Sequence, residues 1–134
     1  MYNTSIFLCG CTKNSGLYIY NNLERLYEVN KLFNQGFKMC IYTNDNNDNT
    51  VLKLNEFKLK HKHFDYINET LVPGERTEVL SHGRNALLNY CKIHYNEYQY
   101  MLMVDLDDVI ETFKAEHLQK LFNINEEFDA LFAN

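Results

Sequence analysis

Short runs of apolar residues alternate along the chain with stretches of helical periodicity. Five apolar runs predict strands at residues 5–10, 37–43, 64–67, 100–104 and 128–133. Apolar residues at helical spacing predict helices over residues 19–33, 75–95 and 112–122, whereas residues 51–57 fit a short helix or a loop. Strands that are apolar on both faces and alternate with helices are typical of parallel sheets. We therefore predict an α/β fold with a mostly parallel, Rossmann-like sheet flanked by helices.

Individual residues suggest where these elements begin and end. Ser15 is a candidate N-cap for the first helix, and Gly36 stands where a glycine commonly follows a helix. Gly10 would allow a sharp exit from the first strand. Gly83, inside the predicted helix 75–95, costs about 1 kcal/mol relative to Ala. A close approach of this helix to the sheet or to a ligand would explain that glycine.

Length and charge limit the classes of protein to consider. The 134 residues (1–134) provide for one domain, and 46% of them are apolar, as in ordinary globular proteins. The formal net charge is −5 and the basic residues are scattered, which argues against a nucleic-acid-binding protein. No apolar stretch approaches the roughly 20 residues of a membrane span. Because no export signal is evident, we expect a cytoplasmic location.

Cysteines and histidines give little sign of a metal site. The four cysteines form no CxxC pair, and we interpret them as reduced, mostly buried thiols: Cys9, Cys11, Cys40 and Cys91. His61 and His63 could ligate a metal, but a basic surface loop is the more common meaning of such a segment.

Polar residues follow three of the predicted strands, and ligands of open parallel sheets bind at the carboxyl ends of strands. They are Thr12, Lys13 and Asn14, then Asn44 and Asp45, then Asp105, Asp107 and Asp108. Three carboxylates within four positions would repel one another unless compensated, and a divalent cation is the usual compensation. The alternative is a solvated loop that caps the following helix.

Two arginines precede the aspartates on the predicted helix 75–95. Arg76 and Arg84 are eight residues apart, so they can face the same side, and Asn85 adjoins the second. Cations beside a metal–carboxylate site suggest an anionic ligand such as a diphosphate. Taken singly, each arginine could instead form a surface salt bridge of little energetic value.

The arginine-bearing helix and the aspartate strand together resemble a known family. Residues 76–88, with Arg84-Asn85-Ala86-Leu87-Leu88, and the strand with Asp105-Leu106-Asp107 are similar to the DxD-containing half of GT-A-fold glycosyltransferases. The similarity is greatest to the capsule and mannan mannosyltransferase type and to small viral or microbial glycosyltransferases. The segment Cys11-Thr12-Lys13-Asn14 also resembles that family's nucleotide-binding start.

This resemblance implies a role for each matching residue. Asp105 would contact the ribose or the metal, and Asp107 would coordinate Mn²⁺ or Mg²⁺ bridging the diphosphate of a UDP- or GDP-sugar. The loop Thr12, Lys13 and Asn14 and the turn Asn44 and Asp45 would line the nucleoside, and Arg76, Arg84 and Asn85 would help to hold the site. The acceptor, a glycan, protein or lipid, is left open. The chain ends soon after its last predicted strand, so we expect the donor-binding half of a transferase and assign no catalytic base.

Two other functions fit the same residues. A haloacid-dehalogenase-type phosphatase would use Asp105 as nucleophile and Asp107 as general acid and base. In that family, however, the motif normally lies on the first strand, whereas here three predicted strands precede it. A non-catalytic nucleotide-binding module would bind through the same groups without a reaction.

Overall fold

A single parallel sheet organises the part of the chain that the computed structural model describes, residues 2–106 and 113–122. Its strands are β1 (Ile6–Thr12), β2 (Phe37–Asn44), β3 (Phe64–Glu69) and β4 (Tyr100–Asp105). They lie in the order β3-β2-β1-β4, and each neighbouring pair is parallel. The predicted α/β fold with a parallel sheet is confirmed. The predicted strand at residues 128–133 lies outside the described residues.

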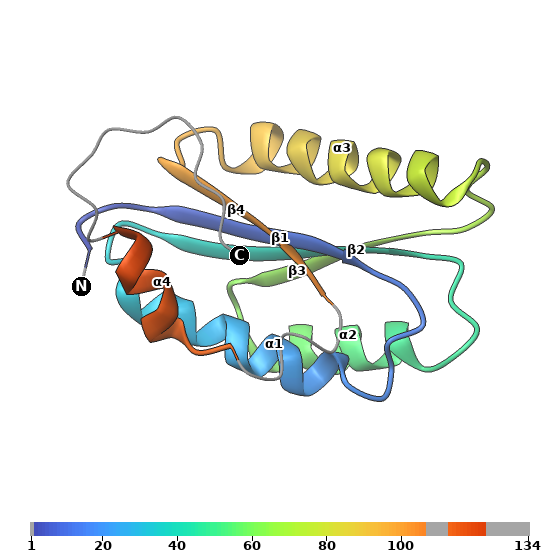
Figure 1. Cartoon of the computed structure of the whole chain (residues 1–134), viewed down its shortest axis with the longest axis horizontal. Helices are drawn as coiled ribbons and strands as arrows, with labels where there is room; N and C mark the ends of the chain where they lie inside the picture. Colours follow the sequence, from blue (N-terminus) through green and yellow to red (C-terminus); the bar gives the residue numbers. More distant parts are fainter. Residues whose placement is uncertain (1, 107–112, 123–134) are drawn as a thin grey trace.

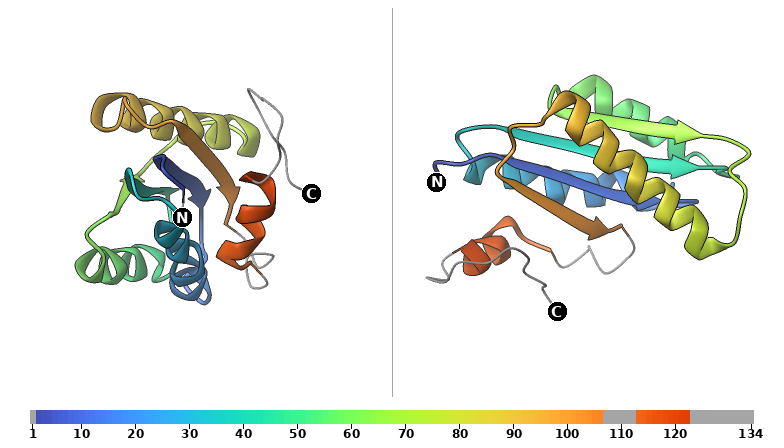
Figure 2. Two further views of the ribbon diagram at one scale, coloured as in Figure 1. Left: turned by 90° about the vertical axis from the view of Figure 1, so that its left-hand side faces the viewer. Right: turned by 90° about the horizontal axis from the view of Figure 1, so that it is seen from above.

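Helices cover both faces of this sheet (Figures 1 and 2). The helices are α1 (Ile19–Tyr27), α2 (Thr50–Lys60), α3 (Arg76–His94) and α4 (Ala115–Phe122), with a 3₁₀ turn, η1 (Glu28–Leu32), directly after α1. Helix α3 lies on one face, and α1, α2 and α4 lie on the other (Figure 1). Within the described residues, no helix is long and apolar enough to cross a membrane, as the sequence predicts.

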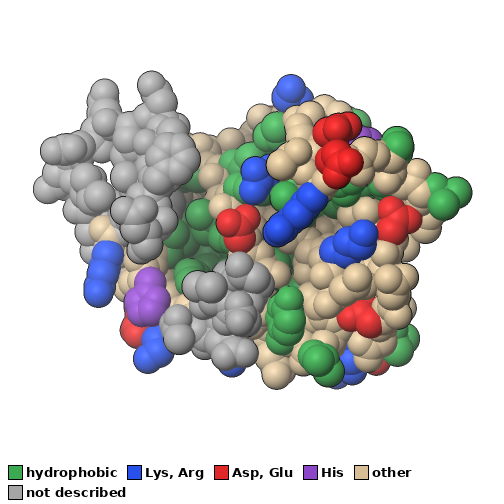
Figure 3. Space-filling model, turned by 45° about the vertical axis from the view of Figure 1, so that its right-hand side comes forward, with side chains coloured by type: hydrophobic (Ala, Val, Ile, Leu, Met, Phe, Trp, Pro, Cys, Tyr) green, Lys and Arg blue, Asp and Glu red, His purple; other side chains and the backbone are tan. Residues whose placement is uncertain are grey.

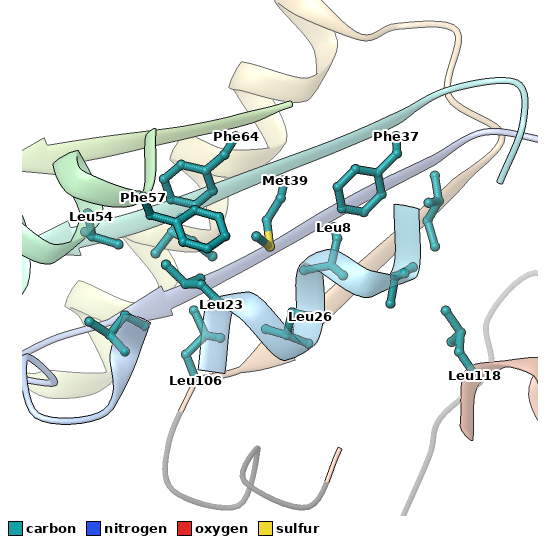
Figure 4. Close-up of a cluster of buried hydrophobic side chains, with 14 of the residues drawn as sticks. Leu8, Leu23, Leu26, Phe37, Met39, Leu54, Phe57, Phe64, Leu106 and Leu118 are labelled. Atoms are coloured by element: carbon teal, nitrogen blue, oxygen red, sulfur yellow. The ribbon is translucent and has the colours of Figure 1, made fainter. Parts of the chain in front are cut away.

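Alternation along the strands creates an apolar core on each face of the sheet. Leu8 and Met39 point towards α1 and α2, where they meet Leu23, Leu54 and Phe57 (Figure 4). The opposite side chains, among them Phe7, Cys9 and Tyr42, pack under Leu87 of α3. Burying each such Leu or Phe stabilises the fold by about 1.5–3 kcal/mol. The two cores therefore fix the sheet between its helical layers and position the strand ends.

The predicted ends of the first helix differ from the observed ones. The α-helix stops at Tyr27 and continues as the 3₁₀ turn, where the Asn30 side-chain amide donates to the Tyr27 carbonyl. A side chain that competes for a backbone carbonyl in this way tightens the last turn. Gly36 therefore does not end the helix; it lies before β2 with φ +137°, in the region that favours glycine. Ser15 is not the N-cap either, since Tyr18 occupies that position.

Gly10 also has a different role from the predicted one. Strand β1 does not exit at this residue but continues to Thr12. A Cβ atom at position 10 would lie 2.4 Å from the backbone oxygen of Val104, so only glycine allows β4 to approach this closely.

Strand β4 is an edge strand of the described sheet, although its run of apolar residues predicts a buried one. Tyr100 and Met101 are 38% and 40% exposed, and no central residue of β4 is fully buried. Spatial strand order depends on packing between distant segments, which an apolar run alone does not reveal.

Candidate functional site

A cleft of about 780 Å³ opens at the carboxyl ends of β1, β2 and β4, beside the first half of α3. Eight of the predicted site residues line it: Thr12, Lys13, Asn14, Asn44, Asp45, Arg76, Arg84 and Asp105. This strand-end cleft lies on the part of the surface where Lys and Arg side chains gather beside Asp and Glu side chains (Figure 3). The topology thus brings together residues that are up to 93 positions apart in the sequence.

Not every predicted site residue belongs to the cleft. Asn85 is exposed on α3 and does not line it. Asp107 and Asp108 lie outside the described residues, so the structure places one member of the aspartate group, Asp105.

Sequence reasoning missed several residues that line the strand-end cleft. Tyr18 follows the loop after β1, and Val72 and Gly74 come from the loop before α3. Val79 and Leu80 belong to the same helical turns as Arg76. These residues are close in sequence to predicted site residues, and that closeness could have indicated that they line the same cleft.

Positive side chains in the cleft are largely unpaired. Arg84 Nη2 lies 3.5 Å from Asp105 Oδ1, and both side chains are well exposed, 49% and 83%. An exposed pair at this distance contributes little to stability. Within the described residues, Lys13 and Arg76 form no ion pair. The cleft therefore offers cationic groups that are available to an anionic ligand.

Helix α3 carries Arg76 and Arg84 to the cleft because it approaches the sheet closely at Gly83. A Cβ atom at this position would lie 2.6 Å from Tyr42 Cδ1 and 3.0 Å from Cys11 Sγ. Those distances are shorter than van der Waals contact, so a side chain larger than hydrogen does not fit. The close approach that the sequence suggested for this glycine is confirmed.

Asp45 serves the structure of the cleft wall. Its carboxylate accepts hydrogen bonds from the Asn44 side-chain amide at 2.9 Å, from Leu71 N–H at 2.6 Å and from Val72 N–H at 3.2 Å. These hydrogen bonds, the Asn44 amide first, hold the pKa of Asp45 below its usual value. Asp45 and Leu71 both have positive φ, 45° and 56°. The carboxylate thus holds the loop before α3 against the end of β2.

Asn14 has a similar structural role on the other side of the cleft. Its backbone N–H donates to Asn46 Oδ1 at 2.7 Å, and its side-chain Oδ1 accepts from Asn47 N–H at 2.7 Å. The buried Thr50 side chain adds a further link, since Ser15 N–H donates to its Oγ1 at 2.8 Å. The loops after β1 and β2 are therefore tied to each other beneath the cleft.

Of the two carboxylates that line the cleft, Asp45 already accepts three hydrogen bonds, which leaves Asp105 as the candidate ligand of a divalent cation. Asp105 is exposed and lines the cleft, and its hard oxygen atoms suit Mn²⁺ or Mg²⁺. Across residues 2–106 and 113–122, no three His, Cys, Asp or Glu side chains come together as a metal group. A complete metal site would need further ligands from the aspartate group or from a bound phosphate.

Among the described residues, the cysteines and His61 show no sign of the reactive or metal-binding roles considered for them. The four cysteines are free thiols, with Cys9 and Cys40 buried as predicted. Burial raises the pKa of the Cys11 thiol, which lines the cleft, and this opposes a nucleophilic role. The ring of His61 stacks on Phe57 at 4.0 Å, and so it completes the core under α2.

In comparisons with known proteins, no protein-family model matches this chain, and no curated protein matches it. What the strand-end cleft binds is therefore inferred from its residues. Its three cationic side chains and its position at the carboxyl ends of parallel strands favour an anionic ligand. The exposed Asp105 carboxylate would instead accept a cation or a hydroxyl group of the ligand.

Proposed function

We propose that the chain binds a nucleotide-sugar donor and acts as a metal-dependent glycosyltransferase. The observation that carries this proposal is the strand-end cleft itself. It gathers Lys13, Arg76, Arg84 and Asp105 from three separate segments at the edge of the sheet where ligands of this fold class bind. The resemblance to GT-A glycosyltransferases involves the same segments.

The cations would hold the diphosphate of the donor. Arg76 and Lys13 lack ion-pair partners among the described residues, and Arg84 has a weak one, so a diphosphate would not have to displace a strong internal pair. Arginine is well suited to phosphate oxygens because its guanidinium donates two parallel hydrogen bonds. The volume of about 780 Å³ is in the range of clefts that hold ligands of this size.

The nucleoside would lie against the loops after β1 and β2. Thr12 and Tyr18 line this side of the cleft together with Asn44. Because Asp45 and Asn14 already hold neighbouring loops, we assign them to positioning these walls. The family resemblance implies that both residues contact the nucleoside directly, whereas we propose that they position the loops that do.

A divalent cation would be held by Asp105 together with Asp107. When bound, Mn²⁺ or Mg²⁺ would act as a Lewis acid that stabilises the departing nucleoside diphosphate. The acceptor could be a glycan, a protein or a lipid, and the residues of the cleft do not select among them.

Thermal unfolding with UDP or GDP tests the proposal. We expect either nucleotide to raise the melting temperature in the presence of Mn²⁺ and not in the presence of EDTA. The Asp107→Ala variant should lose this increase while it keeps the unliganded melting temperature. Arg76→Ala should weaken binding by about tenfold or more, because hydrogen bonds to charged groups contribute about 1.5–3 kcal/mol.

Matched controls use charged residues far from the cleft. Lys92→Ala on α3 and Glu97→Gln should leave the increase unchanged, since both residues are exposed and outside the strand-end cleft. An equal increase with EDTA would contradict the metal bridge. Phosphate release from an aryl phosphate, abolished by Asp105→Asn, would favour the phosphatase. Binding with neither sugar transfer nor donor hydrolysis would favour a non-catalytic nucleotide-binding module.

A further inference from the structure

The outer surface of α2 exposes apolar side chains that the core does not use. Leu54 and Phe57 bury the inner side of this helix, whereas Leu52 and Leu59 are 57% and 81% exposed. At 100° per residue, positions 52 and 59 lie close to the direction opposite Leu54 and Phe57. These two leucines, seven residues apart, therefore point away from the protein on one line of the helix.

A third exposed leucine lies in the loop between β1 and α1. Leu17 is 98% exposed and follows Gly16, whose N–H donates to Asp48 Oδ2 at 2.9 Å, two residues before α2. The loop that carries Leu17 also contributes Asn14 and Tyr18 to the strand-end cleft. Exposed leucines thus occur both in this loop and on α2, and the Gly16–Asp48 hydrogen bond links the loop to the residues just before α2.

Lysines flank Leu52 and Leu59 in the sequence, in a chain whose formal net charge is −5. The segment 50–63 contains one acidic residue, Glu56, and four lysines: Lys53, Lys58, Lys60 and Lys62. Lys53 pairs with Glu56 and Lys58 pairs with Asp65. Among the described residues, Lys60 and Lys62 form no ion pair; Lys60 Nζ lies 5.6 Å from the Tyr20 ring centroid. This leaves Lys60 and Lys62 as the cationic groups of the segment that no described carboxylate neutralises, on a protein that is acidic as a whole.

We propose that the α2 face, defined as Leu17, Leu52, Leu59, Lys60 and Lys62, docks the protein on an anionic lipid bilayer. Exposed leucines can enter the boundary between headgroups and acyl chains, while flanking lysines bind anionic headgroups. A stable protein interface instead needs some 20–30 residues per partner, whereas the exposed leucines here are three and scattered over two segments. The partner that fits is a negatively charged membrane surface.

Vesicle co-sedimentation tests this docking. The full chain is mixed with vesicles of phosphatidylcholine containing about one-third phosphatidylserine, and with vesicles of phosphatidylcholine alone. We expect binding to the anionic vesicles that decreases as salt is raised, because the lysine contribution is screened. The double variant Lys60→Glu/Lys62→Glu should lower the partition coefficient by at least about fivefold, the value of one lysine near such a surface. Leu52→Ser/Leu59→Ser should lower it to a similar degree.

Matched controls use α3, on the other face of the sheet. Ile93 is 76% exposed and Lys92 is exposed beside it, so Ile93→Ser and Lys92→Glu change the same kinds of side chain elsewhere. Both should bind anionic vesicles like the unmodified chain. The proposal is overturned if the unmodified chain does not sediment with anionic vesicles, if the α2 variants bind as it does, or if the α3 variants lose binding equally. Dimerisation through Leu52 and Leu59 without vesicle binding would also overturn it.

Discussion

At the scale of single residues, a glycine and a hydrogen-bonded aspartate shape the cleft as much as its cationic side chains do. Gly83 has no Cβ, which lets α3 lie against Tyr42 and Cys11 and brings Arg84 to Asp105. Asp45 uses its carboxylate on backbone N–H groups of the cleft wall. The ligand-binding groups would then be Lys13, Arg76 and Arg84, whose positions depend on these structural residues.

Replacing Gly83 by alanine should destabilise the fold. The added methyl would lie 2.6 Å from the Tyr42 ring, and inserting a methyl into a packed contact costs about 1–3 kcal/mol. Alanine's helix propensity offsets about 1 kcal/mol of this. Urea unfolding of Gly83→Ala should therefore show a lower free energy of unfolding. Ser81→Ala, at an exposed position of the same helix, is the control and should change it by at most about 0.5 kcal/mol. A more stable Gly83→Ala protein would contradict the close contact.

The hydrogen bonds of Asp45 should make the loop before α3 sensitive to acid. The folded protein lowers the pKa of Asp45, so the ionised carboxylate stabilises the fold. This contribution is complete above the pKa of Asp in the unfolded chain, about 3.9, and is lost as pH falls through the lower pKa of the folded protein. As pH falls below about 3.9 and Asp45 becomes protonated, the Leu71 amide should lose protection against hydrogen exchange. Asp45→Asn, which tolerates the positive φ, should have lower protection that varies less with pH.

Glu97→Gln provides the comparison for this measurement, since Glu97 is exposed and far from the loop in the sequence. It should keep the acid-dependent loss of Leu71 protection. If Asp45→Asn showed the same pH dependence as the unmodified chain, another group would be responsible.

At the scale of elements, the sequence predicts most of what the structure contains. Apolar runs located β1 to β4 to within two residues at every end. For the central strands β1 and β2 the reason is burial on both faces, which leaves a continuous apolar signature. Helix ends were less predictable, because they depend on local hydrogen bonds. Before α1, Tyr18 N–H and Ile19 N–H both donate to the Ser15 carbonyl, and in η1 the Asn30 side chain donates to the Tyr27 carbonyl. The edge position of β4 and the contact of Asp45 with Leu71, 26 residues later, depend on tertiary structure.

The link between the loops after β1 and β2 should contribute measurably to stability. Thr50→Val keeps the size of the side chain but removes the buried hydroxyl that accepts from Ser15 N–H and donates to Asp48 Oδ1. An unsatisfied buried donor costs about 1–3 kcal/mol, and we expect a loss of that size in chemical unfolding. Thr50→Ser keeps the hydroxyl and should lose less. Equal stability of Thr50→Val and the unmodified chain would show that water or another group satisfies Ser15 N–H.

At the scale of the whole molecule, the two ends of the sheet differ in chemistry. A second cleft, about 640 Å³, lies at the amino ends of the strands and is lined by Ser5, Gly36 and residues 94–99. Among the residues that line this second cleft, Glu97 is the one with a formal charge at neutral pH. The strand-end cleft instead carries three cations and two carboxylates. A nucleoside diphosphate should therefore select the carboxyl ends of the strands.

Chemical-shift mapping on the ¹⁵N-labelled chain tests this central claim most directly. Titration with UDP or GDP in the presence of Mg²⁺ should shift amide resonances of residues 12–18, 44–45 and 72–84, which surround the strand-end cleft. Resonances of residues 94–99 should remain in place. Shifts concentrated at residues 94–99, or no shifts at millimolar nucleotide, would contradict the assignment of this cleft as a nucleotide-sugar site.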